Sequence, residues 1–274
     1  MNRIICGLSE HEKEEFNAYI SNRFEGLEEI TEHDTDFLGT WEAIISYSAI
    51  FGAAEAINTK VCPKRPVEFA SPDTLEIKMY GSFAGNIPII YVRDTSDFER
   101  LVTNIVYKGV RPDGLETTGA SFIYGKTTRF IILSSKPYSN VTAAELGLDD
   151  ADWAEKSMLL RRGHECTHYF TKQTYGVTNN ILHDEIMADL IGMYEAFGFY
   201  RAEWFLRFMG VIEGGGKRLG FYTKDLSPNV RAAVSELLKT AAYRLEEWTN
   251  TDEFRALSDA ERIKRMCKNS PLIF

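Results

Sequence analysis

Cysteine and histidine are both scarce in this chain, which limits the kinds of site that it can form. The sequence of 274 residues holds 4 cysteines and 5 histidines. The cysteines lie far apart and form no CxxC pair, so neither a cysteine-based zinc site nor a disulfide framework is expected. They are predicted to be free, buried thiols: Cys6, Cys62, Cys166 and Cys267. A metal site in this chain must therefore depend on histidine.

Long apolar runs and an excess of positive charge are also missing. No run of about 18 apolar residues occurs, which excludes a membrane-spanning helix. The first residues, MNRIICGLSEHEKEEF, lack the apolar core of a secretory signal, so a cytoplasmic location is expected. With 31 basic and 40 acidic residues, the net charge is −9. This acidic balance argues against binding to nucleic acid or to an anionic membrane.

Hydrophobic periodicity predicts strands in the first half of the chain and helices in the second. Before residue 138, helical patterns lie at 10–24, 41–58 and 94–106, and the alanine- and isoleucine-rich second one is expected to be buried. Strand patterns lie within 67–91, at 118–124 and at 127–135, the last two as a hairpin. After Pro137, helical patterns lie at 152–172, 181–199, 229–248 and 252–267. We therefore expect an α+β fold in a single domain, 1–274.

The stretch that indicates chemistry is HECTH, residues 164–168, within a helical pattern. Residues four apart share one face of a helix, so His164 and His168 can present two imidazoles to one cation. Glu165 lies about 100° round the helix, near enough to hydrogen-bond a metal-bound water without ligating the metal. Zinc would lower the pKa of that water to about 7, and Glu165 could accept its proton. Cys166 points away from both histidines and is expected to pack in the core.

A second element, DEIMAD at residues 184–189, strengthens the prediction of a metal site. Glu185 and Asp189 are four residues apart and share a helix face. Glu185 can supply a third zinc ligand from a second helix, which leaves the fourth position open for water. Asp189 can accept the free N–H of a ligating histidine and so fix its tautomer.

HECTH followed by EIMAD resembles the gluzincin branch of the zincin metallopeptidases, with its thermolysin-like pattern HExxH…ExxxD. The resemblance covers residues 160–198 and, in outline, the preceding sheet. It implies a zinc ion (Zn²⁺) held by His164, His168 and Glu185, with Glu165 as general base and Asp189 as partner of a ligating histidine. It also implies a zincin-like fold with a helical and sheet part, 1–138, and a helical part that carries the zinc site, 139–274. The cleft would lie between them.

Other zincin patterns and ligands fit less well. The metzincin extension would need glycine at 171 and histidine at 174, and both positions are threonine. His183 is a rival third ligand, but it is turned about 200° away from Glu185 on a helix. Thermolysin-like enzymes also place a histidine downstream to stabilise the oxyanion, and no histidine follows His183. A tyrosine or arginine would have to replace it, with these candidates: Tyr175, Tyr200, Arg218 and Tyr222.

The resemblance also implies where a peptide substrate would bind. The family fold pairs the substrate with an edge strand before the metal helix, and here the candidate strand contains Gly119, Ala120, Ser121 and Phe122. An interior strand without a ligand role is the alternative. We expect zinc-assisted hydrolysis of a peptide or protein substrate. Two other hypotheses remain, a catalytically silent zincin-like protein that binds a cytosolic partner, and a structural domain with an accidental motif.

Overall fold

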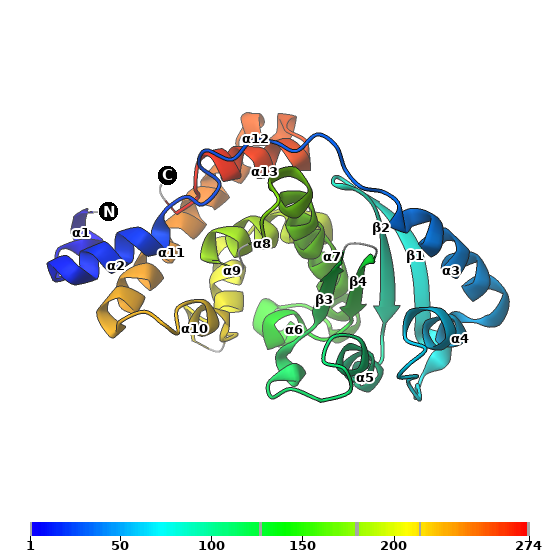
Figure 1. Ribbon diagram of the computed structural model, residues 1–274. Helices are drawn as coiled ribbons and strands as arrows, with labels where there is room; N and C mark the ends of the chain where they lie inside the picture. The colour runs from blue at the N-terminus through cyan, green and yellow to red at the C-terminus, as the bar shows by residue number, and fades with distance from the viewer. Residues whose placement is uncertain (1, 126–127, 179–180, 214, 273–274) are drawn as a thin grey trace.

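The computed structural model describes residues 2–125, 128–178, 181–213 and 215–272 and has an α+β architecture. The long helix α7 (Asp150–Tyr175) runs through the middle of the molecule. A small mixed sheet lies on one side of α7, and most of the other helices lie on the opposite side (Figure 1). The predicted fold class is therefore confirmed at the level of α+β.

The sheet has four strands in the order β1-β2-β4-β3. β1 (Leu75–Ser82) pairs with β2 (Gly85–Val92) in an antiparallel hairpin. β2 pairs in parallel with β4 (Arg129–Ser134), and β4 pairs antiparallel with β3 (Ala120–Tyr124). The predicted hairpin of β3 and β4 is confirmed, although Lys126 of its expected turn and Thr127 of its expected second strand lie outside the described residues. In this order β1 and β3 are the edges of the sheet.

Both faces of the sheet are covered. Alternate residues of the inner strands point to opposite sides, and in β2 and β4 both sets are apolar and packed. Ile90 and Ile132 contact the helices α3 (Phe37–Phe51) and α5 (Thr95–Ile105) in one apolar cluster. Their neighbours Ile89 and Ile131 pack on the other face, against Tyr169 of α7. The metal-motif helix is therefore fixed to the sheet by its apolar side.

The helix predicted at residues 41–58 is shorter than expected. α3 ends at Phe51, since Gly52 has a φ of 89°, a conformation that only glycine adopts without strain. The chain continues as α4 (Ala53–Ala56) and a π-helical turn, η1 (Ile57–Val61). The prediction that this stretch is buried is wrong in its middle, where Ile50 is 74% exposed and Phe51 is 58% exposed, although Ala56 and Ile57 beyond them are buried.

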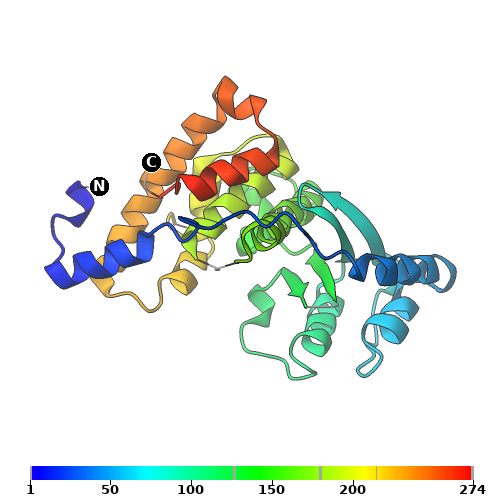
Figure 2. The same cartoon turned by 45° about the horizontal axis from the view of Figure 1, so that its top comes forward.

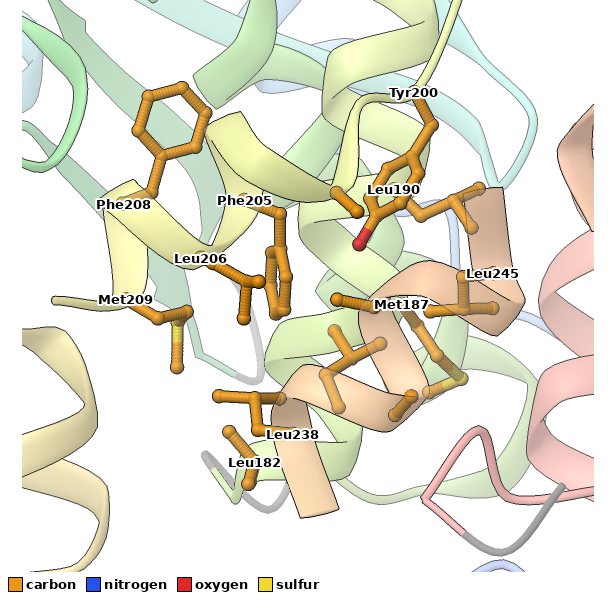
Figure 3. Packing of buried hydrophobic residues seen from close by; sticks show 14 of the residues in the cluster. Leu182, Met187, Leu190, Tyr200, Phe205, Leu206, Phe208, Met209, Leu238 and Leu245 are labelled. Carbon is orange, nitrogen blue, oxygen red and sulfur yellow. The ribbon is translucent and has the colours of Figure 1, made fainter. Parts of the chain in front are cut away.

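The helical part is built around α8 (Leu182–Phe197), which packs along α7. Figure 3 shows the apolar core where α8 meets α9 (Ala202–Met209) and α11 (Pro228–Thr249). The helix predicted at 252–267 is in fact two, α12 (Asp252–Ala256) and α13 (Asp259–Lys268), because Ser258 forms a capping box with Glu261. The remaining short elements are α1 (Asn2–Ile5), α6 (Ala143–Leu146), α10 (Arg218–Tyr222), η2 (Pro72–Thr74), η3 (Leu115–Thr117) and η4 (Tyr138–Asn140).

The N-terminal residues belong to the helical part rather than to the sheet. α2 (Glu10–Ile20) places Phe16 and Ile20 in the helical core beside α11. The chain then crosses the end of α7 to reach α3 (Figure 2), and Ile30 N–H donates to Thr174 O at 2.7 Å on the way. This arrangement differs from the expected division at residue 138, which grouped the first helices with the sheet.

The cysteines and the membrane prediction can be compared directly with the structure. All four cysteines are free, and three of them are buried, but Cys6 is exposed, contrary to expectation. Cys166 of α7 packs against the sheet within the core, as predicted. Within the described residues, none of the helices combines the length and the apolar character that a membrane crossing needs.

Candidate metal centre

His164 and His168 of α7 and Glu185 of α8 converge at one point. The Nε2 atoms of the two histidines are 3.1 Å apart. Glu185 Oε2 lies 3.5 Å from His164 Nε2, and Glu185 Oε1 lies 3.6 Å from His168 Nε2. All three residues are buried. Within the described part of the chain, they are the group of neighbouring side chains that could hold a metal ion. The three predicted ligands therefore come together.

Two glycines let the helices that carry these ligands touch. A Cβ atom on Gly192 of α8 would lie 2.4 Å from Leu160 O of α7, and one on Gly163 would lie 2.8 Å from Gly192 Cα. Neither distance is compatible with a side chain, so the two backbones are in direct contact here. This close approach brings the Glu185 side of α8 against the histidine side of α7.

Asp189 lies behind His164, where the sequence predicted it. His164 Nδ1–H donates to Asp189 Oδ1 at 2.8 Å, which leaves His164 Nε2 facing the cluster. The hydroxyl of Tyr138 also donates to Asp189 Oδ1, at 2.5 Å. Burial alone would raise the pKa of Asp189, but the charge of Arg218 and these hydrogen bonds lower it to about 2. Asp189 is therefore an ionised acceptor that fixes the His164 ring.

The two histidines differ in their surroundings. Burial lowers the pKa of His164, but the hydrogen bond that it donates to Asp189 and the charge of Glu185 outweigh burial and raise it. Burial and the neighbouring His164 lower the pKa of His168 to about 4. His168 Nδ1 has no hydrogen-bond partner among the described residues, so no described protein group holds its ring from behind as Asp189 holds that of His164.

Arg218 joins two of the carboxylates of α8, those of Glu185 and Asp189, a role that the sequence did not reveal. Its Nη2 donates to Glu185 Oε2 at 2.6 Å, and its Nη1 donates to Asp189 Oδ2 at 2.7 Å. The charge of Asp189 offsets the cost of burial and raises the pKa of Arg218 well above its usual value. Because Arg218 contacts Glu185 Oε2, Glu185 Oε1 remains directed at His168.

The four candidates for the missing downstream histidine separate into two pairs. Arg218 and Tyr222 line the cavity that contains the metal group. Tyr200 is 4% exposed and lies in the helical core, as Figure 3 shows. Tyr175 packs edge-on against Phe24, with ring centroids 5.7 Å apart. Only the first pair is therefore placed to reach a ligand in this cavity.

Glu165 faces the same cavity, which has a volume of about 810 Å³. It is half-buried and makes no hydrogen bond to the other described residues. Burial raises the pKa of Glu165, although the charge of His164 opposes the shift. A raised pKa makes a carboxylate a stronger base, which favours the transfer of a proton to it from a neighbouring group.

His183, the rival ligand, lies outside the metal group. Its Nε2–H donates to Met266 O at 2.9 Å, and its ring packs edge-on against Phe24 with centroids 5.2 Å apart. It is 1% exposed. His183 therefore connects α8 to α13 within the core.

The candidate substrate strand is an edge of the sheet, so the alternative of an interior strand is ruled out. Gly119 and Ala120 line the cavity together with the two histidines. Ser121 and Phe122 continue along β3, where Phe122 packs against Tyr169 of α7. The start of this edge strand is therefore next to the metal group.

The fold and the site together define an α+β protein with a buried histidine–carboxylate group that could hold a metal ion. A family model matches residues 46–128 and 126–270, most of the chain. The chain belongs to this family, which is described as a family of unknown function (DUF7005). No curated protein and no solved structure matches the chain.

Proposed function

We propose that the protein is a zinc-dependent metallopeptidase of the gluzincin type. The observation that carries this proposal is the convergence of His164, His168 and Glu185 in a cavity that Glu165 also lines. The cavity opens beside the edge strand β3, which could pair with an extended peptide.

Zinc is the metal that this donor set fits best. Two imidazoles and one carboxylate are the ligands of many catalytic zinc sites. Bond lengths of about 2.0–2.2 Å at tetrahedral angles separate such donor atoms by about 3.4 Å. The two Nε2 atoms are 3.1 Å apart, close to that value, and each Nε2 has one oxygen of Glu185 nearby, Oε2 at 3.5 Å from His164 and Oε1 at 3.6 Å from His168. When bound, zinc would polarise a peptide carbonyl and lower the pKa of a water molecule to about 7.

The chain's own residues would divide the remaining work. Glu165, with its raised pKa, would accept a proton from the attacking water and deliver it to the leaving amine. Asp189 would hold the His164 ring through Nδ1. Tyr222, which lies in the cavity beside Arg218, would donate a hydrogen bond to the negatively charged oxygen that forms on the carbonyl.

Two substitutions test this proposal. Glu165→Gln keeps the size of the side chain but removes the proton acceptor, so zinc content should stay at about one per chain while hydrolysis of a peptide library falls about 100-fold or more. Glu185→Gln replaces an anionic ligand with a poor neutral one, so zinc itself should be lost. Glu155→Gln, on the exposed surface of the same helix, is the matched control and should change neither quantity.

A silent zincin-like binding protein is the second candidate, favoured by the absence of a histidine after His183. If the zinc-loaded wild type cleaves no member of a broad peptide library, the enzyme proposal fails. If Glu165→Gln then still alters the binding of a partner, the silent protein is the better account. If the wild-type protein contains no zinc as purified and takes up none when zinc is added, the peptidase proposal and the silent-binder alternative both fail.

A further inference from the structure

The cavity contains a second buried guanidinium, that of Arg161, which lies one helical turn before His164 on α7. Arg161 is 5% exposed. Its Nη1 donates to Ser134 O at 3.2 Å and to Lys136 O at 2.5 Å, and its Nη2 donates to Pro137 O at 3.1 Å. All three acceptors are neutral carbonyls. Arg161 forms no ion pair with any carboxylate among the described residues.

Arg218 provides a direct comparison within the same cavity. Both guanidiniums lie near the ring of Tyr138, with Arg161 at 5.4 Å and Arg218 at 5.3 Å from its centroid. Arg218 is neutralised by Glu185 and Asp189. Buried charges are costly unless an opposite charge compensates them, so the two arginines are in very different electrostatic states.

The charge balance of the cavity adds to this contrast. Arg161, Lys217 and Arg218 line it, against Glu165 and Glu185. Asp189, directly behind, makes the numbers of positive and negative side chains equal. A divalent cation on the histidines would therefore leave an excess of positive charge. Such a cavity favours an anionic ligand over a neutral one.

The backbone of the edge strand comes very close to Arg161. A Cβ atom on Gly119 would lie 2.2 Å from Arg161 Nε, so no side chain fits there while the guanidinium keeps its position. The glycine is needed for space, since its backbone conformation is one that any residue adopts. The charged group is therefore at the place where a peptide paired with β3 would enter the cavity.

We infer that Arg161 binds a carboxylate of the substrate and so selects peptides with a negative charge close to the cleaved bond. This inference rests on the proposed peptidase function for the nature of the substrate. Arg161 and His164 are three residues apart, a rise of about 4.5 Å along the helix, and an extended peptide spans about 3.3–3.6 Å per residue. The carboxylate is therefore placed one or two residues from the bond held at the histidines. A C-terminal carboxylate and an acidic side chain both supply this chemistry.

Binding to metal-free protein tests the inference without using activity. The dissociation constants of N-acetyl-trialanine and of its C-terminal amide would be compared by saturation-transfer NMR. A charge-assisted pair with a guanidinium should favour the acid about 10–100-fold. A second pair of amidated peptides, with glutamate or glutamine as the central residue, shows whether a side-chain carboxylate is accepted. Equal affinities within both pairs, or no detectable binding of any acid, would overturn the inference.

Variants locate the preference at Arg161. Arg161→Gln should reduce the preference for the acid to less than about 3-fold, and Arg161→Lys should restore part of it. Gly119→Ala displaces the guanidinium without removing its charge and should also weaken the preference. Gly81→Ala in β1 is the matched control, because a Cβ atom there meets only Asn86 Oδ1, at 3.6 Å. A folded Arg161→Gln protein that keeps the wild-type preference would refute the assignment.

The inference and the proposed function can fail separately. Zinc-loaded wild type that cleaves acid and amide peptides equally well would overturn the role of Arg161 and leave the peptidase proposal intact. Metal-free protein that prefers the acid, combined with no hydrolysis by the zinc-loaded form, would support carboxylate binding and reject the peptidase. The wild-type comparison needs no variant, so the test stands even if Arg161→Gln does not fold.

Discussion

Gly192→Ala should damage the metal centre from a distance, because it acts on the contact between the two helices that carry the ligands. The added methyl group would lie 2.4 Å from Leu160 O and 3.3 Å from His164 N. Carbon–oxygen contacts are ordinarily about 3.3–3.6 Å, so α7 and α8 must separate by about 1 Å. Leu160 O belongs to the helix backbone and cannot move alone.

The consequence for the site follows from the tolerance of metal coordination. Ligand distances in metal sites are kept within about 0.2 Å, and the helices would separate by several times that value. We expect the affinity for zinc to fall about 10-fold or more. Overpacking of this kind also costs about 1–3 kcal/mol of unfolding free energy, which corresponds to a decrease of roughly 2–10 °C in Tm for a chain of this size.

Competition with a fluorescent zinc chelator would measure the affinity, and thermal unfolding of the metal-free protein would measure the stability. Gly39→Ala is the matched control, since it is exposed on a helix and a Cβ atom there meets nothing within 4 Å. It should leave zinc affinity unchanged and stabilise the protein by about 0.5–1 kcal/mol. If Gly192→Ala kept both stability and zinc affinity within about 2-fold of wild type, the close helix contact would not be what positions the ligands.

Three shorter predictions concern the groups around the ligands. Zinc at 100 times its dissociation constant should stabilise the fold by about 2.7 kcal/mol, and a chelator should reverse the increase in Tm. Asp189→Ala should weaken zinc binding about 10–100-fold in chelator competition, and an unchanged affinity would contradict its role behind His164. Tyr138→Phe should lower the unfolding free energy by about 1–3 kcal/mol, measured in urea, because it removes the hydroxyl that donates to Asp189.

The helical ligands could be predicted from the sequence because their geometry is local. Residues four apart share a face whatever the rest of the chain does, so the places of His164 and His168 follow from the helix alone. The same holds for Glu185 and Asp189 on α8. The contact between the two faces, in contrast, depends on tertiary packing. Gly163 marks the point of contact, but its role can be recognised only when the partner helix is known.

Tyr138 and Arg218 could not be placed from the sequence, because neither lies on a long periodic element. Tyr138 begins the irregular turn η4, in which Ser139 has a φ of 55°. Arg218 begins α10, a helix of 5 residues that shows no clear periodicity. Both reach Asp189 through tertiary packing alone. Gly52 and Ser258, in contrast, are visible boundary signals, and the predicted helices ran past both of them.

The pairing of Arg218 with Glu185 and Asp189 makes a prediction about how zinc and stability are coupled. Arg218→Gln leaves two adjacent buried carboxylates without their cation, which should cost about 3–5 kcal/mol in metal-free protein. Zinc would supply the missing positive charge, so the increase in Tm on zinc addition should be larger in Arg218→Gln than in wild type.

Arg162→Gln is the control for this coupling, because Arg162 pairs with Glu195 on the same two helices away from the candidate metal site. It should lower stability equally with and without zinc, since that pair does not involve the ligands. If zinc raised the Tm of Arg218→Gln less than that of wild type, Arg218 would act mainly by positioning Glu185. The buried guanidinium would then be part of what prepares the site for the metal, rather than a charge that replaces the metal in its absence.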